Sequence, residues 1–292
     1  MEKLSVLILS GLTNGSVYGL VGLSLSLIYV SSRVINFAQG EFVMLGAMST
    51  VFFLLTLGLP APLSVVASVT LGLAVALLLE RLVYAPLARR ADPLTVMIGT
   101  FAAAVVIAGG ALVAWGPNQL FVPNLFSLEP IRLGAITTTA QQCAIIVSFL
   151  LFIVLTWWVL FKTNFGLTIR AVGVNPTIAR LMGIRSERII RFGFLFSAAV
   201  SVVAGVLIGP LLGGQASMGV LLSVKGFMAA ILGGLGSPFA AAAGGILIGV
   251  LEALVGGYGN SLYAEPIIFA LILIVLLVKP YGLLGEFEAV QR

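Results

Sequence analysis

Apolar segments long enough to cross a lipid bilayer follow one another along this chain with only short polar connections. An apolar helix needs ~20 residues to span a hydrocarbon core of ~30 Å, and a backbone in lipid must satisfy its own hydrogen bonds. The segments cover residues 4–30, 42–59, 63–84, 94–115, 140–161, 192–212, 221–235, 239–255 and 267–278. The sequence therefore predicts an all-α, polytopic membrane helical bundle of about eight to nine crossings or partial crossings with broken helices, forming one transmembrane domain over residues 1–292.

The composition narrows the chemistry available to such a bundle. The chain is 60% hydrophobic and 9% charged, and it has no His and one Cys. A His/Cys metal site and an internal disulfide are therefore excluded, and serine nucleophiles have no histidine base. Because the G-x-x-x-x-G-K-[ST] phosphate loop is also missing, we expect neither catalysis nor a bound metal or cofactor on this chain.

The distribution of basic residues predicts the orientation in the membrane, because cytoplasmic loops carry the excess of Lys and Arg. With the N-terminus outside and the C-terminus inside, the outer side and the helices receive only Lys3, Arg132 and Lys225 of the 15 basic residues. The cytoplasmic side receives Arg33, Arg81, Arg89, Arg90, Lys162, Arg170, Arg180, Arg185, Arg188, Arg191, Lys279 and Arg292. We therefore predict a cytoplasmic segment at residues 162–191. The same asymmetry explains the net charge of +5, so this charge does not indicate binding to nucleic acid.

That cytoplasmic segment contains the signals of one short helix. Asn175-Pro176 is a strong start, because Asn caps free backbone N–H groups and Pro is tolerated at the first helical position. Gly183 predicts the end of this helix. Between the start and the end, Ile178, Leu181 and Met182 form an apolar stripe on one side of the helix. A helix of about two turns is marginal alone in water, so we expect it to dock on a partner or, alternatively, to lie on the lipid surface.

The series of apolar segments contains one short segment, which is followed by a run of helix-breaking residues. Residues 221–235 amount to about 22 Å of helix, which is short of a full crossing. The next residues contain the helix breakers Gly233, Gly234, Gly236 and Pro238. Breaks at membrane depth are tolerated where protein or a watery cavity satisfies the backbone, and they mark sites in transporters. A tight turn at the membrane surface is the alternative.

Several polar residues lie near or within apolar segments and are candidates for a substrate path. They are Asn14, Asn36, Gln39, Glu41, Gln215 and Glu252. The spacing of Asn36 and Gln39 resembles a capping box, and Glu41 would complement a helix N-terminus. This region is either a polar hinge along the path or an ordinary cap at the membrane edge with its charge in water. Glu252 is the main candidate if the chain is instead an ion-coupled carrier.

Small residues recur every four positions on three segments, which permits close approach of helices within the bundle or at a dimer face. These ladders are Gly11, Gly15 and Gly19; Gly205, Gly209 and Gly213; and Ala241, Gly245, Gly249, Ala253 and Gly257.

Four stretches resemble the permease subunits of branched-chain amino acid ABC importers. They are residues 35–42 (INFAQGEF), residues 166–184 with RAVGVNPTIARLMGI, the GGLGSP run at 233–238 followed by GGILIGVLEAL, and the closing KPYGLLG at 279–285. Each stretch alone is weak, and together they are specific. The chain resembles the shorter of the two permeases in the leucine/isoleucine/valine system, and the resemblance runs from end to end.

The resemblance implies the partners and the coupling segment. Members of the family work with a second related permease, two ATPase subunits that hold ATP and Mg, and an extracytoplasmic solute-binding protein, in the inner membrane of bacteria or archaea. It implies ATPase coupling through Arg170, Asn175, Pro176, Ile178, Ala179, Arg180, Leu181, Met182 and Gly183. The implied function is ATP-driven import of branched-chain amino acids by alternating access. Import of urea or short-chain amides is the alternative, and an ion-coupled secondary transporter is a further one.

Overall fold

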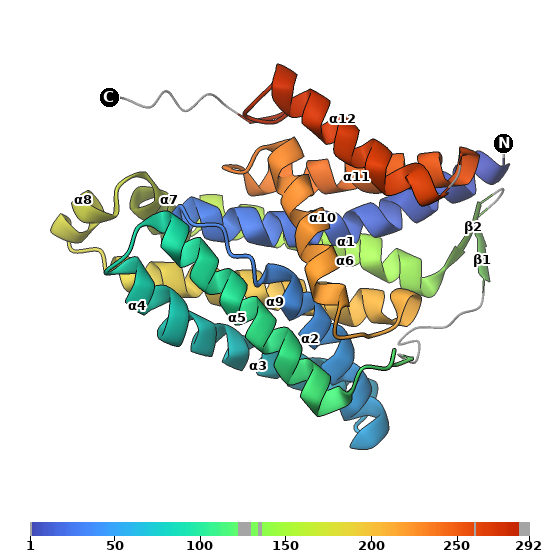
Figure 1. Cartoon of the computed structure of the whole chain (residues 1–292), viewed down its shortest axis with the longest axis horizontal. Helices are drawn as coiled ribbons and strands as arrows, with labels where there is room; N and C mark the ends of the chain where they lie inside the picture. Colours follow the sequence, from blue (N-terminus) through green and yellow to red (C-terminus); the bar gives the residue numbers. More distant parts are fainter. Residues whose placement is uncertain (1, 122–129, 134–135, 260, 286–292) are drawn as a thin grey trace.

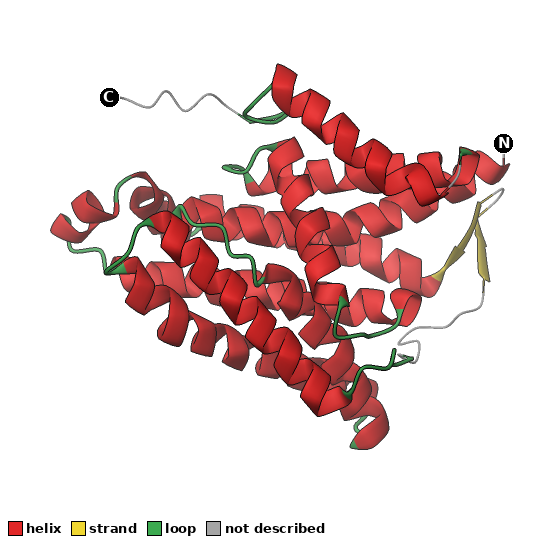
Figure 2. Ribbon diagram, in the orientation of Figure 1, coloured by secondary structure: helices red, strands yellow, loops and turns green. Residues whose placement is uncertain are grey.

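The computed structural model describes residues 2–121, 130–133, 136–259 and 261–285, and these form a bundle of helices with one small β-hairpin (Figures 1 and 2). The helices are α1 (Glu2–Ser32), α2 (Gln39–Val51), α3 (Ala61–Leu79), α4 (Ala85–Ala88), α5 (Pro93–Trp115), α6 (Ala140–Lys162), α7 (Asn164–Val174), α8 (Pro176–Leu181), α9 (Ser186–Leu212), α10 (Met218–Gly233), α11 (Pro238–Tyr258) and α12 (Ala264–Val278). The π-helical segments η1 (Phe52–Thr56) and η2 (Glu80–Tyr84) extend α2 and α3, and a 3-10 turn, η3 (Ser261–Tyr263), precedes α12.

Every apolar segment of the sequence folds as helix. In the described part of the chain, eight helices are long and apolar enough to cross a membrane, and the 16-residue α10 is a shorter ninth. The prediction of eight to nine crossings or partial crossings is therefore confirmed. The antiparallel hairpin of β1 (Pro130–Leu133) and β2 (Ile136–Thr139) was not predicted. It lies at the end of the bundle where α1 begins, and α7 and α8 lie at the opposite end (Figure 1).

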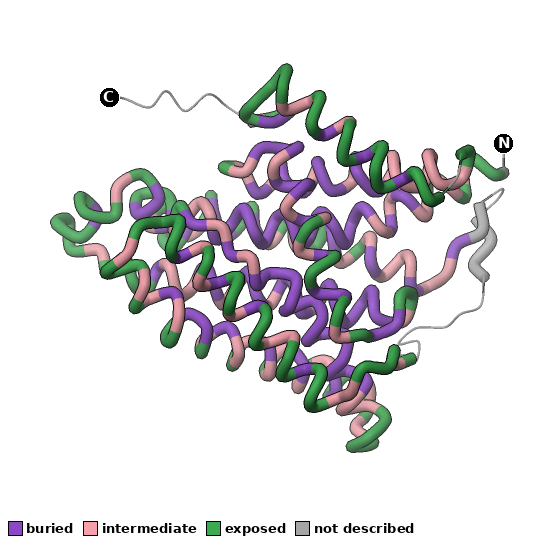
Figure 3. Tube along the Cα trace, in the orientation of Figure 1, coloured by how far each residue is buried: buried purple, intermediate pink, exposed green. Residues whose placement is uncertain are grey.

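The helices divide into a buried centre and an outer ring. Figure 3 shows burial concentrated on α1, α2 and α9, and exposure along α5 and α12. All residues of α2 are buried, and 61% of the most apolar 18 residues in each of α1 and α9 are buried. The corresponding share is 28% in Ala61–Ala88, α5 and α6, and 17% in Ser261–Val278. Because the exposed side chains of the ring are apolar, these helices suit contact with lipid or with other membrane helices.

The glycine ladders account for several close contacts between helices. A Cβ on Gly249 of α11 would overlap the backbone of Gly15 on α1, and one on Gly245 would overlap Gly19. In the same way Gly205 of α9 lies against the Val43 carbonyl of α2. The predicted close approach is thus confirmed within this one chain, where glycine lets two backbones meet without side chains between them.

Replacing Gly249 by valine is expected to separate α1 from α11 and to destabilise the protein. Overpacking typically costs about 1–3 kcal/mol, and backbone atoms here cannot move aside as a flexible side chain would. Gly256→Ala is the matched control on the same helix, because a Cβ there would meet nothing within 4 Å. Thermal unfolding in detergent should show a lower Tm for Gly249→Val alone, and equal Tm values would contradict the packing argument.

The predicted helix break lies between α10 and α11, inside the bundle. Gly234 has a φ of +132°. Helix α11 begins at Pro238, directly after the N-capping residue Ser237. The Ser26 hydroxyl donates to the Leu235 carbonyl at 2.6 Å. A side chain of α1 therefore supplies a partner for a carbonyl of the break, as irregular backbone in a membrane protein requires. A break at membrane depth and a tight turn at the membrane surface both stay predictions.

The segment after α12 returns to the end of α10. The N–H groups of Leu283 and Leu284 donate to the carbonyls of Leu232 and Gly233 at 2.8 and 3.0 Å. Carbonyls at a helix C-terminus have no partner within their own helix, so this segment supplies donors for two such groups.

Candidate functional site

The short helix α8 forms as its sequence signals predict. The Asn175 side chain accepts hydrogen bonds from the N–H groups of Thr177 and Ile178 at 3.0 and 3.1 Å, and Pro176 occupies the first turn. Gly183 has a φ of +84°, the left-handed conformation that ends helices at glycine. The preceding helix α7 lies in the same basic segment and was not predicted. The start and the end of α8 are therefore fixed by local chemistry.

The apolar stripe of α8 points away from the bundle. Ile178, Leu181 and Met182 are 58%, 83% and 78% exposed, whereas Ala179 on the opposite side is buried. Arg180 and Arg185 are exposed beside the stripe, and Arg170 is exposed on α7 with its guanidinium over the Phe161 ring. We call Ile178, Leu181 and Met182 the α8 face. A fixed helix that presents three uncovered apolar side chains suits docking on a protein groove.

A small core attaches α8 to the long helices. Ala179 packs in a cluster with Leu160 of α6, Ile169 and Val172 of α7 and Ile189 of α9. The Ser186 hydroxyl at the start of α9 donates to the Pro176 carbonyl at 3.3 Å. A force applied to the α8 face therefore reaches α9, which belongs to the buried centre of the bundle.

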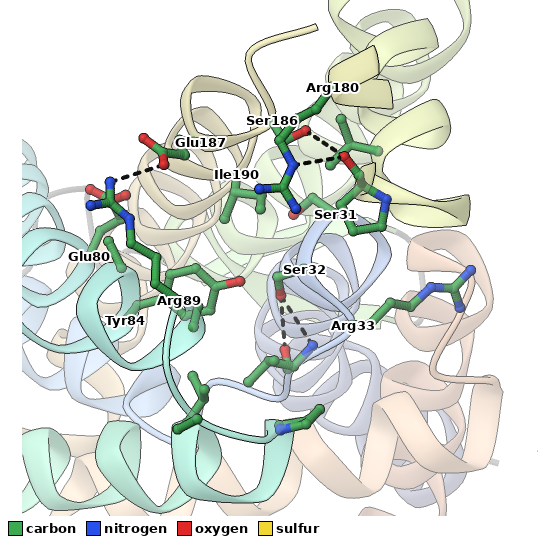
Figure 4. Close-up of a pocket in the computed structure, with 18 residues that line it drawn as sticks. Ser31, Ser32, Arg33, Glu80, Tyr84, Arg89, Arg180, Ser186, Glu187 and Ile190 are labelled. Atoms are coloured by element: carbon green, nitrogen blue, oxygen red, sulfur yellow. Dashed lines mark hydrogen bonds and ion pairs between the residues drawn. The ribbon is translucent and has the colours of Figure 1, made fainter. Parts of the chain in front are cut away.

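A cavity of about 510 Å³ separates α8 from the ends of α1, α3 and α5 (Figure 4). Two ion pairs lie beside it: Arg89 with Glu187 at 2.9 Å and Arg191 with the buried Glu80 at 2.8 Å. The distribution of basic residues predicted a cytoplasmic position for both arginines without indicating these partners. Both pairs join α9 to the α3–α4 region across this cavity, so they hold the two sides of this end of the bundle together.

Three of the predicted path residues lie together at the start of α2. The Gln39 side-chain N–H groups face the hydroxyls of Ser24 and Ser201 at 3.0 and 2.7 Å, and its oxygen accepts from Asn36 at 3.2 Å. Ser24 lies about 12 Å along α1 before its end. This polar cluster is therefore buried within the bundle, and a cap with its charge in water does not describe it.

The predicted capping box is also wrong, although the residues are in contact. Helix α2 begins after Ala38 without a side-chain cap. The Asn36 oxygen accepts from the Ala38 N–H at 3.1 Å, and the Phe37 N–H donates to Thr100. Irregular backbone at this depth needs such partners, and side chains supply them from several helices.

Glu41 follows this bend, and its side chain is fully buried. Neither carboxylate oxygen has a hydrogen-bond partner in the described part of the chain. The carboxylate lies directly against Gly219, in the first turn of α10, where a Cβ would overlap it. The expectation of a charge in water does not hold for this residue.

The other predicted path residues lie elsewhere. Glu252 of α11 forms an ion pair with Lys225 of α10, which also lies 3.2 Å from the Tyr18 hydroxyl and 3.4 Å from a Glu265 oxygen. Asn14 is half-buried on α1, one turn before Tyr18, and Gln215 is exposed in the connection between α9 and α10. The structure thus brings Asn36, Gln39 and Glu41 together in a buried position, whereas Gln215 is exposed four residues before Gly219.

Comparisons with known proteins agree with this arrangement. The family described as "Branched-chain amino acid transport system / permease component" matches residues 7–277. The high-affinity branched-chain amino acid transport system permease protein LivH of Salmonella typhimurium is 32% identical over 96% of this chain and 94% of that protein. BraD of Pseudomonas aeruginosa is 31% identical over 96% and 95%. A probable LivH of Methanocaldococcus jannaschii is 30% identical over 94% and 90%.

These matches cover nearly the whole length of the chain and of its relatives, and they agree with a bundle that has eight helices long enough to span a membrane. The resemblance found in the four sequence stretches is confirmed. The chain is a multi-pass membrane protein, and it belongs to the family of permease components of branched-chain amino acid transport systems.

Proposed function

We propose that this chain is a permease subunit of an ATP-driven importer and carries branched-chain amino acids across the cytoplasmic membrane by alternating access. The observation that carries the proposal is the α8 face, whose three apolar side chains are exposed at the end of the bundle opposite the N-terminus. Such a face needs a protein partner, and an ATPase subunit is the partner that an importer of this family requires.

The coupling follows from the packing around α8. Closure of the ATPase pair on ATP moves α8, and the cluster around Ala179 transmits the movement to α9. Since α9 packs against α1 and α2 in the buried centre, the shift reaches the polar cluster around Gln39. The ATPases must bind the two states of the permease with different free energies, because equal binding could not bias them.

The proposal includes a second related permease, two ATPase subunits that hold ATP and Mg, and an extracytoplasmic binding protein. The N-terminus lies outside and the C-terminus inside, which places the basic segment at residues 162–191 in the cytoplasm. The chain itself needs no cofactor. Among the other candidate mechanisms, ion coupling through Glu252 is disfavoured, because Lys225 already pairs with that carboxylate.

Co-expression with neighbouring ATPase, permease and binding-protein genes tests the proposal. We expect a stoichiometric complex to purify from detergent, and its ATP hydrolysis to rise when leucine-loaded binding protein is added. The same assay with urea or acetamide separates the amide alternative. If the chain purifies alone and moves leucine into liposomes without ATP, the proposal is wrong.

A further inference from the structure

The carboxylate of Glu41 is the one acidic group buried in the bundle, among the described residues, that has no cation beside it. Glu80 pairs with Arg191, and Glu252 pairs with Lys225. Glu41 is fully buried, and both of its oxygens lack a hydrogen-bond partner. Burying an ionised carboxylate without partners costs several kcal/mol in general, so a chain that needed only packing here would be more stable with a neutral side chain.

Two helix N-termini keep this carboxylate in a favourable potential without occupying its oxygens. Glu41 lies in the first turn of α2, and it packs against Gly219 in the first turn of α10. Each helix N-terminus carries roughly half a positive charge. Both helix dipoles therefore favour the ionised carboxylate, and its oxygens remain available to a further donor.

The polar neighbours of Glu41 are already engaged with one another. The Gln39 amide donates to serine oxygens, and Ser223 accepts from the Gly40 N–H at 2.8 Å and donates to the Phe37 carbonyl at 3.3 Å. The Phe37 ring packs against Phe101 and Phe227. A neutral polar frame thus surrounds one carboxyl group that has no partner, and the ionised form of this group is the complement of a small cation.

A zwitterionic amino acid brings such a cation into the bundle. Its ammonium group has three donors and needs an acceptor when it leaves water. We propose that Glu41 binds the ammonium group of the transported amino acid when the start of α10 moves away from α2. The proposal rests on the importer function given above. Gly219 covers the carboxylate in the present arrangement, where a Cβ would overlap its oxygens.

The test is Glu41→Gln in the complete importer, reconstituted in liposomes with saturating leucine-loaded binding protein. The variant keeps the shape and removes the charge. We expect leucine uptake per ATP hydrolysed to fall roughly ten-fold or more, since a charge-assisted hydrogen bond is lost. We also expect the Tm of the purified permease to rise, because a buried unpaired charge is gone. Glu265→Gln, which neutralises the half-exposed carboxylate of α12, is the matched control. This variant should keep the wild-type leucine uptake per ATP hydrolysed.

The expected fall in uptake and the expected rise in Tm together distinguish a binding role of Glu41 from a structural one. A lower Tm together with lower uptake would mean that the carboxylate supports the fold, and it would overturn the proposal. Uptake at the wild-type ratio in Glu41→Gln would overturn the ammonium site and leave the importer function intact. If the wild-type complex does not form or does not carry leucine, both proposals fail together, and that result appears before any variant is compared.

Discussion

Replacing Leu181 by aspartate is expected to abolish ATP-coupled uptake, with a loss of at least about 100-fold. Leu181 is 83% exposed on the α8 face, so the substitution disturbs no contact of the bundle. In the complex the same position would enter a groove on the ATPase, where a carboxylate is buried without a partner at a cost of several kcal/mol. Membrane insertion and the Tm of the isolated permease should be unchanged, while the ATPase subunits no longer copurify.

Two control variants make this result specific. Thr177→Asp adds the same charge to the same helix outside the apolar stripe, at the N-terminus where the helix dipole favours an acid. Leu181→Met keeps the apolar character and volume. Both should retain the complex and most of the uptake. Wild-type uptake in Leu181→Asp would rule out α8 as the docking helix, whatever the controls do.

Replacing Lys225 by methionine is expected to cause a larger loss of stability than Gly249→Val. Lys225 is 12% exposed and faces Glu252, Glu265 and Tyr18, so it connects α10 with α11, α12 and α1. Removing one partner of a buried ion pair typically costs about 3–5 kcal/mol, because the other charge stays buried. Thermal unfolding and the yield of monodisperse permease in detergent measure the effect.

The double variant Lys225→Met/Glu252→Gln provides the comparison for this pair. Removing both charges should restore most of the lost stability, as neutral groups of similar volume often replace a buried pair without loss. Glu252→Gln alone should cost less than Lys225→Met, because Lys225 keeps Glu265 as a second acceptor. A double variant no more stable than Lys225→Met would show that α10 and α11 depend on something other than this charge balance.

Local signals in the sequence predicted most of the helical fold correctly. The length of each apolar segment determined the helices, and Asn175, Pro176 and Gly183 determined α8 to within a residue or two. The glycine ladders predicted close approach without naming the partners, because a ladder does not specify which helix it faces. The pairing of Gly15 with Gly249 depends on the complete arrangement of the chain.

The candidate site was less predictable, because its contacts join residues far apart in the sequence. Asn36, Gln39 and Glu41 could be identified as polar residues beside a span, but their depth follows from Ser24 of α1 and Gly219 of α10. The Gln39–Ser201 contact crosses 162 positions. The local pattern even suggested a capping box, since the spacing was right and the competing tertiary partners were invisible.

The return of the C-terminal segment to α10 has a consequence for biosynthesis. The carbonyls of Leu232 and Gly233 are synthesised long before Leu283 and Leu284, whose N–H groups bind them. During translation, the C-terminal end of α10 therefore lacks two hydrogen-bond donors until the segment after α12 has been made. A premature stop just before Lys279 removes no helix of the bundle, yet it leaves these two carbonyls without their partners, so we expect the truncated chain to accumulate to a lower level than the full chain.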